Sequence, residues 1–86
     1  MSDIVIYSSN YCGYCFRAKA LLKKKNVSFR EINVDMNAKA RAEMRSRSGG
    51  ATSFPQIIID GEPIGGCDEL YALDSAGKLD DLLKLA

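Results

Sequence analysis

The sequence lacks histidine and tryptophan altogether, and its 86 residues include only three cysteines and two prolines. Without histidine, every mechanism that needs an imidazole as base or as metal ligand is excluded. Structural zinc takes four Cys or His ligands, so three cysteines cannot complete such a site within one chain. An odd number of cysteines also disfavours a framework of structural disulfides, and we therefore expect a reducing, cytoplasmic compartment.

Long apolar runs are also missing. No stretch approaches the ~18 consecutive apolar residues of a membrane-spanning helix, so no membrane association is predicted. The first residues carry neither the basic nor the apolar region of a signal peptide. Hydrophobic residues make up 47% of the chain and charged residues 27%, as in ordinary globular domains. At this length we expect one domain over residues 1–86.

The charge is unevenly distributed, although the net charge is only +1. Residues 17–47 carry ten Lys or Arg and three Asp or Glu, a local charge of +7. Two interpretations stay open: a solvated basic face, or a surface that attracts an anionic substrate or acidic partner proteins. Aromatic residues are not interleaved with these basic residues, so no nucleic-acid partner is predicted.

Apolar segments and turn signals predict an α/β fold with the order β-α-β-α-β-β-α and a short closing helix. A helix between the first two strands makes a right-handed βαβ unit with parallel strands, and Asp60-Gly61 predicts a hairpin. The natural packing is a mixed four-stranded sheet flanked by helices on both faces. We expect strands at 4–7, 27–34, 56–60 and 62–64, helices at 16–25, 38–48 and 67–73, and a closing helix that includes residues 79–85.

Two apolar patterns predict which sides of the first two helices are buried. In the first helix, Cys15, Ala18 and Leu22 fall at helical spacing and form one stripe, with Leu21 beside them. In the second helix the buried side is expected to consist of residues that recur every four positions, namely Met36, Ala40 and Met44.

Cys12 and Cys15 form a C-x-x-C pair between the first strand and the first helix. A cysteine at a helix N-terminus faces unpaired N–H groups and the positive end of the helix dipole, which favour the thiolate. Cys12 is therefore the expected nucleophile, and Cys15, one turn further along, is expected to attack a disulfide formed on Cys12. This is the dithiol arrangement of a redox protein. Tyr11 and Tyr14 flank Cys12, and either cover the helix end or wall a groove for substrate.

Two further segments are candidates for substrate binding. Phe54-Pro55 precedes a strand; it is either an ordinary strand entry or, if cis, a place where an extended peptide pairs with the backbone. Gly65-Gly66-Cys67-Asp68 opens a helix; it is either a capped turn or a site whose N–H groups hold a carboxylate while Asp68 pairs with an ammonium group. Cys67 itself is expected to be a small buried residue, with a reactive third thiol as the alternative.

Over its whole length the chain resembles the glutaredoxin family, most of all its short bacterial members. The resemblance implies a thioredoxin-like fold with a cis Phe54–Pro55 bond. It implies reduction of glutathione–protein mixed disulfides and protein disulfides, with glutathione as cosubstrate, Cys12 as the attacking thiol and Cys15 as the resolving one. A monomer is expected. The glutathione-binding residues implied by family position are Tyr14, Ser53, Phe54, Pro55, Gly66, Cys67 and Asp68. The segments that carry the resemblance are residues 11–15, 17–22, 53–57 and 64–73.

Three positions depart from the usual pattern of this family. Gly13 replaces a proline; family members with glycine there can hold a [2Fe–2S] cluster between two subunits, with the first cysteine as ligand. A cluster-bridged dimer using Cys12 is therefore an alternative function, as is a thioredoxin-like reductant fed directly by a reductase. Ser9 stands where a lysine is common, which puts the charge that lysine supplies in doubt. Phe54 replaces a valine and is expected to narrow or reshape the groove.

Overall fold

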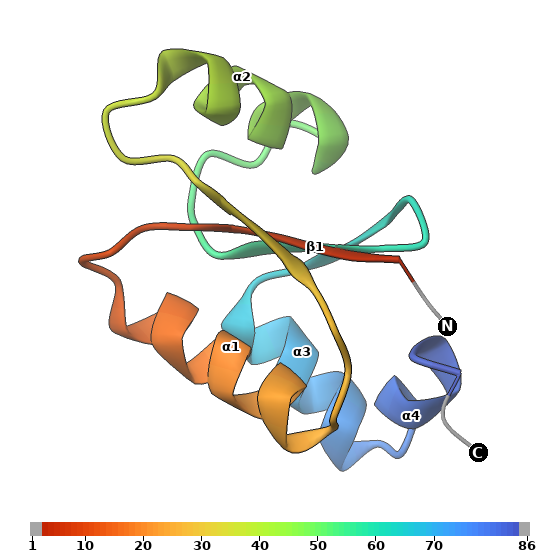
Figure 1. Cartoon of the computed structure of the whole chain (residues 1–86). Coiled ribbons are helices and arrows are strands. Elements are labelled where there is room, and N and C mark those ends of the chain that lie inside the picture. The colour runs from red at the N-terminus through yellow and green to blue at the C-terminus, as the bar shows by residue number, and fades with distance from the viewer. Residues whose placement is uncertain (1–2, 85–86) are drawn as a thin grey trace.

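Four strands form one mixed sheet in the computed structural model, which describes residues 3–84. The sheet has the order β2-β1-β3-β4; β1 pairs with β2 in parallel, and the other two pairings are antiparallel. Figure 1 shows α2 on one face of the sheet and α1 and α3 on the other. The predicted α/β order and the mixed sheet are confirmed. The elements are β1 (Ile4–Ser8), α1 (Gly13–Lys24), β2 (Arg30–Asn33), α2 (Ala38–Arg47), β3 (Gln56–Ile59), β4 (Glu62–Gly65), α3 (Cys67–Ser75) and α4 (Leu79–Leu82).

The strand β1 is buried along its whole length because both faces of the sheet are covered. Its side chains alternate between two apolar clusters, as strand geometry requires. Ile4 and Ile6 pack with α1, α3 and α4, whereas Val5 and Tyr7 pack with α2. The expected stripe of α1 is buried in the first cluster, apart from Cys15, which is buried outside it. Because β1 is packed on both faces, its C-terminal end is held in place, and the loop to α1 begins there.

The predicted buried side of α2 is partly wrong. Ala40 and Met44 are buried, but Met36 is fully exposed with a φ of 51°. The helix begins only after Asn37, whose side-chain oxygen accepts the N–H of Ala40 at 3.0 Å. Met36 lies in the preceding loop, where the four-residue spacing of a helix no longer places a side chain on the buried face.

Other boundaries differ by a few residues. The helix α1 begins at Gly13 rather than at residue 16, and the second strand is restricted to Arg30–Asn33. Leu85, expected in the closing helix, lies outside the described residues. The hairpin turn is confirmed, because Asp60 and Gly61 both have positive φ between β3 and β4. Within residues 3–84, no helix is both long and apolar enough to cross a membrane.

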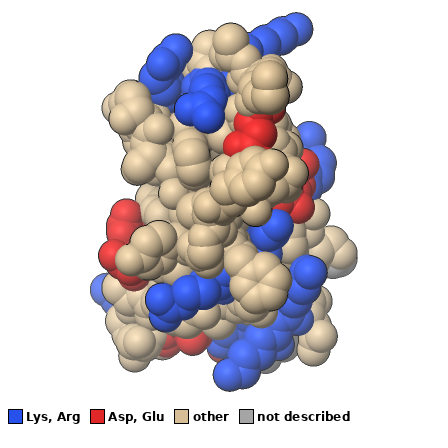
Figure 2. Space-filling view, turned by 90° about the vertical axis from the view of Figure 1, so that its left-hand side faces the viewer, with Lys and Arg blue, Asp and Glu red and all other residues tan. Residues whose placement is uncertain are grey.

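The loop from β1 to α1 and the loop from β2 to α2 lie at the same end of the molecule, on the left in Figure 1. Figure 2 views this end directly. Lys and Arg gather at its top, where α2 lies, and at its bottom, where α1 lies; the band between them is uncharged at its centre and carries Asp or Glu at its sides.

Candidate active site

Cys12 is the N-cap of α1, so the local fold places its sulfur at the helix start that the sequence predicted. Its Sγ accepts the backbone N–H of Cys15 at 3.2 Å, and its thiol donates to the carbonyl oxygen of Phe54 at 3.7 Å. The side chain of an N-cap normally satisfies one of the orphan N–H groups of the first turn. Here a sulfur takes that position, and the residue is partly exposed to solvent.

Cys15 lies one turn along α1 and is completely buried. Burial raises the pKa of the Cys15 thiol to about 12, and its hydrogen bond with Cys12 acts in the same direction, while a bond from the backbone of Ser9 opposes the shift. Loss of solvation penalises the charged thiolate, which explains the sign. The C-x-x-C pair therefore combines one accessible sulfur with one that is held as a protonated thiol.

The loop that carries Cys12 is fixed to the loop between β2 and α2 by one carboxylate. Ser9 donates its hydroxyl to Asp35 at 2.6 Å, and the backbone N–H of Asn10 donates to the same carboxylate at 2.8 Å. The Ser9 hydroxyl bond, followed by the Asn10 bond, lowers the pKa of Asp35. The serine also accepts the N–H of Tyr11 at 3.2 Å. Ser9 thus anchors the loop instead of supplying the charge of a lysine.

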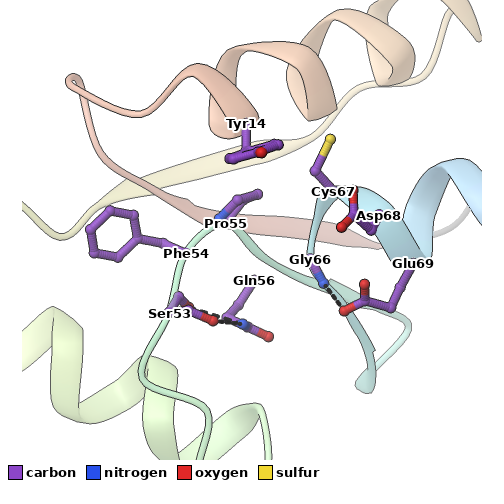
Figure 3. A pocket seen from close by; sticks show the side chains of 9 residues that line it. All are labelled: Tyr14, Ser53, Phe54, Pro55, Gln56, Gly66, Cys67, Asp68 and Glu69. Carbon is purple, nitrogen blue, oxygen red and sulfur yellow. Dashed lines mark hydrogen bonds between the residues drawn. The ribbon is translucent and has the colours of Figure 1, made fainter.

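A pocket of about 180 Å³ opens beside this end of α1. It brings together every residue for which the family resemblance implied glutathione binding, and two that the sequence analysis did not identify, Gln56 and Glu69. Figure 3 shows the pocket between the segment that enters β3 and the start of α3, with Tyr14 above it. Tyr11 is not part of the lining. The lining residues are Tyr14, Ser53, Phe54, Pro55, Gln56, Gly66, Cys67, Asp68 and Glu69.

Phe54 contributes its backbone, not its ring, to the centre of this pocket. Its ring points away from the other lining residues (Figure 3) and packs against the cluster beneath α2. Arg41 of α2 lies over that ring, with its guanidinium carbon 5.5 Å from the ring centre and its Nε donating to the carbonyl of Val34 at 3.1 Å. The ring of Phe54 therefore does not fill the centre of the pocket; whether Phe54 narrows or reshapes the groove relative to a valine stays a prediction. The Phe54–Pro55 bond is cis, as the resemblance implied.

The other wall of the pocket is the N-terminus of α3. The carboxylate of Glu69 accepts the N–H of Gly66 at 3.0 Å, which satisfies one N–H group at this helix end. Gly65 has a φ of 112°, and a Cβ there would lie 2.7 Å from Glu69 Oε1, so only glycine fits. The N–H groups of Cys67 and Asp68 belong to the first turn of α3, where no intrahelical carbonyl faces them.

Cys67 and Asp68 have opposite environments although they are neighbours. Cys67 is only 4% exposed and packs in the main apolar cluster, and this burial raises the pKa of its thiol. The predicted packing role of Cys67 is therefore confirmed. Asp68 is exposed at the pocket rim. Within the described part of the chain, no group of three or more His, Cys, Asp or Glu is arranged to hold a metal ion.

Comparison with known proteins agrees with this geometry. The glutaredoxin family model matches residues 4–64. Glutaredoxin 3 of Escherichia coli K12 is 57% identical over 84 residues, covering 98% of this chain and 100% of the relative. A glutaredoxin of Pseudomonas aeruginosa is 51% identical, covering 96% and 98%.

The fold of this chain is also similar to those of solved glutaredoxin structures. The solution structure of Brucella melitensis glutaredoxin has a TM-score of 0.82 at 52% identity, covering 95% of this chain and 88% of that one. A buckwheat glutaredoxin–glutathione complex has a TM-score of 0.85 at 30% identity, covering 96% and 77%. The predicted thioredoxin-like fold is confirmed. The chain therefore belongs to the glutaredoxin family of thiol–disulfide oxidoreductases.

Proposed function

We propose that this chain uses glutathione to reduce glutathione–protein mixed disulfides and protein disulfides through Cys12 and Cys15. One observation carries the proposal: Cys12 is partly exposed, and its sulfur lies 3.7 Å from the carbonyl oxygen of Phe54, a residue that lines the pocket. The buckwheat relative was solved as a glutathione complex, which supports this choice of cosubstrate. We further propose that the chain works as a monomer in a reducing, cytoplasmic compartment.

The first step is attack by the Cys12 thiolate on the glutathione sulfur of a mixed disulfide. A Cys12–glutathione disulfide forms, the original S–S bond breaks, and the protein thiolate leaves and takes a proton from water. The N–H of Cys15 already points at the attacking sulfur and stabilises negative charge there. Once Cys12 has lost its proton it no longer donates to Phe54, so that carbonyl becomes available to the backbone of the bound tripeptide.

The second step regenerates Cys12 in one of two ways. A second glutathione thiolate attacks the bound glutathione, which yields oxidised glutathione and the free Cys12 thiolate. Alternatively Cys15 attacks Cys12, releases glutathione and leaves a Cys12–Cys15 disulfide, which two further glutathione molecules reduce. Because its burial keeps Cys15 protonated, it must lose a proton before it attacks. Glutaredoxin potentials of about −200 to −230 mV lie near the glutathione poise of the cytosol, so both directions are accessible.

The two walls of the pocket suit the two ends of glutathione. At α3, the N–H groups of Cys67 and Asp68 are suited to the carboxylate of the γ-glutamyl end, and the Asp68 carboxylate to its ammonium group. On the opposite side, the backbone of Phe54 pairs with the peptide, while Ser53, Pro55 and Tyr14 complete the wall. The carboxylate at the other end of glutathione needs a cation. We assign this role to Arg41, since Ser9 carries no charge; Arg41 does not line the pocket but lies over the outward-pointing ring of Phe54, so it would bind a carboxylate that extends out of the pocket on that side.

Replacing each cysteine of the pair separately tests these roles. We expect Cys12→Ser to abolish reduction of a small glutathione mixed disulfide, because no other accessible thiol faces the pocket. Cys15→Ser is expected to keep this activity, since glutathione alone completes the cycle. Loss of activity in Cys15→Ser as complete as in Cys12→Ser would refute the assignment. Turnover that proceeds equally well without glutathione would favour a reductant fed directly by a reductase.

A second candidate function is a dimeric [2Fe–2S] carrier, and Gly13 favours it. Nothing lies within 4 Å of the place where a side chain at Gly13 would begin, so a second chain has room to approach Cys12. Such a cluster takes four ligands, and one chain offers only Cys12, so two chains and two glutathione molecules would be needed. Anaerobic reconstitution with iron, sulfide and glutathione tests this. A brown dimer that loses its colour on Cys12→Ser supports the candidate; a colourless monomer excludes it.

A further inference from the structure

Exposed large apolar side chains are concentrated at the end of the molecule that carries Cys12. In the described range, residues 3–84, the four such residues are Tyr11, Tyr14, Phe16 and Met36. Tyr14 lines the pocket, but the other three do not. Tyr11 is 93% exposed, Phe16 72%, and Met36 is fully exposed. No fold requirement explains them, because none packs in either apolar cluster.

Chain neighbours and two hydrogen bonds place these three residues near Cys12. Tyr11 directly precedes it, and the N–H of Phe16 donates to the carbonyl of Cys12 at 3.2 Å. Met36 follows Asp35, whose carboxylate accepts the N–H of Asn10 at 2.8 Å. The loop anchor therefore places Met36 beside the loop that carries Tyr11. We call Tyr11, Phe16 and Met36 the apolar rim. Exposed apolar side chains that lie close together mark interaction sites, whereas singly scattered ones are normal on any protein surface.

Positive charge flanks the apolar rim on two sides. The helix α1 carries four basic residues and no acidic one, and α2 carries four basic residues and one acidic one. Figure 2 shows Lys and Arg at the top and at the bottom of this end; the band between them is uncharged at its centre and carries Asp or Glu at its sides. Such an arrangement attracts negatively charged partners and orients them before contact. The basic residues nearest the helix starts are Arg17 and Lys19 on α1, of which Lys19 pairs with Glu31 at 2.7 Å, and Lys39 and Arg41 on α2. The last turns of the two helices, further from Cys12, carry Lys23, Lys24, Arg45 and Arg47.

We propose that the apolar rim docks the protein half of the mixed disulfide. The partner is a polypeptide whose glutathionylated cysteine has apolar side chains next to it and acidic residues further out. This inference rests on the proposed function, in which glutathione fills the pocket beside Tyr14. The protein half then lies outside the pocket, across the exposed side of Cys12, where Tyr11, Phe16 and Met36 are the surface available to it. The rim thus sets which protein disulfides are substrates, while the pocket sets the preference for glutathione.

The test compares three substrates with the wild type and with the variant Tyr11→Ser/Phe16→Ser/Met36→Ser. The substrates are a glutathionylated peptide with apolar and acidic residues around its cysteine, a peptide of equal length with Ser and Lys at those positions, and the small mixed disulfide of cysteine and glutathione. We expect the wild type to have a kcat/KM about tenfold higher for the first peptide than for the second. We expect the variant to lose that advantage and to keep kcat/KM for the small disulfide within about twofold.

Further measurements separate the possible outcomes. Glu62→Ser, at an exposed position of the hairpin at the opposite end, is the control and should keep the wild-type preference. In the wild type, the advantage of the acidic peptide should shrink as salt is raised, which tests the docking even if the triple variant does not fold. Equal rates for both peptides, or a variant that loses the small disulfide as well, would overturn the docking proposal. A wild type inactive on all three substrates would instead overturn the proposed function.

Discussion

Two helices of this protein have a cysteine at their N-terminus, one as the N-cap and one as the first helical residue, and the surroundings of the two cysteines differ. Cys12 is the N-cap of α1, is partly exposed and accepts the N–H of Cys15. Cys67 is the first residue of α3, is 4% exposed and lies in the core, where burial raises the pKa of its thiol. Both residues lie at the N-terminus of a helix, the positive end of its dipole. A helix N-terminus alone therefore does not distinguish the two thiols, whereas access from solvent does, and we propose that this access makes Cys12 the reactive one.

The two helix starts also differ in the charge of their first turns. The first turn of α1 contains no acidic residue, whereas that of α3 contains Asp68 and Glu69. Glu69 fixes Gly66, and Asp68 faces the pocket. In the proposed function, the start of α1 provides the attacking sulfur and the start of α3 holds the ligand. The following changes, from the largest expected effect to the smallest, test that division of roles.

Gly65→Ala, next to the start of α3, should lower the stability of the protein and have the largest effect of these changes. A side chain there combines a strained φ of 112° with a 2.7 Å approach to Glu69 Oε1, so we expect a loss of about 1–3 kcal/mol in the free energy of unfolding. A loss of 1 kcal/mol lowers Tm by about 4–8 °C in a domain of this size. Gly61→Ala is the matched control, because its φ of 83° is also positive but nothing lies within 4 Å. Equal losses in the two variants would show that the contact with Glu69 does not matter.

Asp68→Asn should weaken glutathione binding and leave the chemistry intact. The neutral amide no longer attracts the ammonium group of the γ-glutamyl end, so we expect KM for glutathione to rise about tenfold, which corresponds to about 1.4 kcal/mol. Because Asp68 does not touch Cys12 in this account, kcat should change little. Steady-state kinetics at varied glutathione measures both. Glu62→Gln removes an exposed acid far from the pocket and should leave KM unchanged; an unchanged KM in Asp68→Asn would remove the residue from the site.

Cys15 should make stability depend on pH in the alkaline range. Its pKa is raised by burial to about 12 in the folded chain, against about 8.5 for a free thiol. The contribution of this thiol to the free energy of unfolding is fully present below about pH 8.5 and is lost as the pH rises toward 12. The reason is that the thiol of the unfolded chain, with its lower pKa, releases its proton first. The slope is at most about 1.4 kcal/mol for each pH unit. Urea unfolding of the wild type and of Cys15→Ala measures it, and parallel pH profiles would contradict the buried, protonated thiol.

Gly13→Ala should have the smallest effect and the opposite sign. Gly13 is the first residue of α1, and nothing lies within 4 Å of the place where a Cβ would be. Alanine is the better helix former, so we expect a gain of up to about 1 kcal/mol. Thermal unfolding checks this directly. A gain would mean that glycine at this position does not serve folding, and would sharpen the case for a role beside Cys12; a loss of stability would remove that inference.

Local patterns in the sequence correctly predicted the features that are set by residues close together in the chain, such as a buried helix face and a hairpin turn. The stripe of Cys15, Ala18 and Leu22 follows from helical spacing, and the hairpin follows from Asp60-Gly61. The same local logic failed at Met36, because spacing within a helix has no meaning for a residue outside it.

Contacts between distant segments were not predictable in this way. Ser9 and Asp35 are 26 positions apart, and no local signal indicates that a serine replaces the usual lysine by hydrogen-bonding to that carboxylate. Arg41 on the ring of Phe54 joins α2 to the entry of β3 in the same manner. Such pairs depend on how elements pack against each other, which short patterns do not specify. The sequence showed only that residues 17–47 are rich in Lys and Arg, which does not distinguish Arg41 from the other basic residues of that segment.

The most direct test of the central claim is to map the glutathione adduct. Cys15→Ser protein, in which the resolving thiol is absent, is exposed to oxidised glutathione, digested and analysed by mass spectrometry. The account predicts one glutathione per chain, attached to Cys12, with Cys67 unmodified because it is buried. An adduct on Cys67, or a folded protein that takes up no glutathione at all, would contradict it.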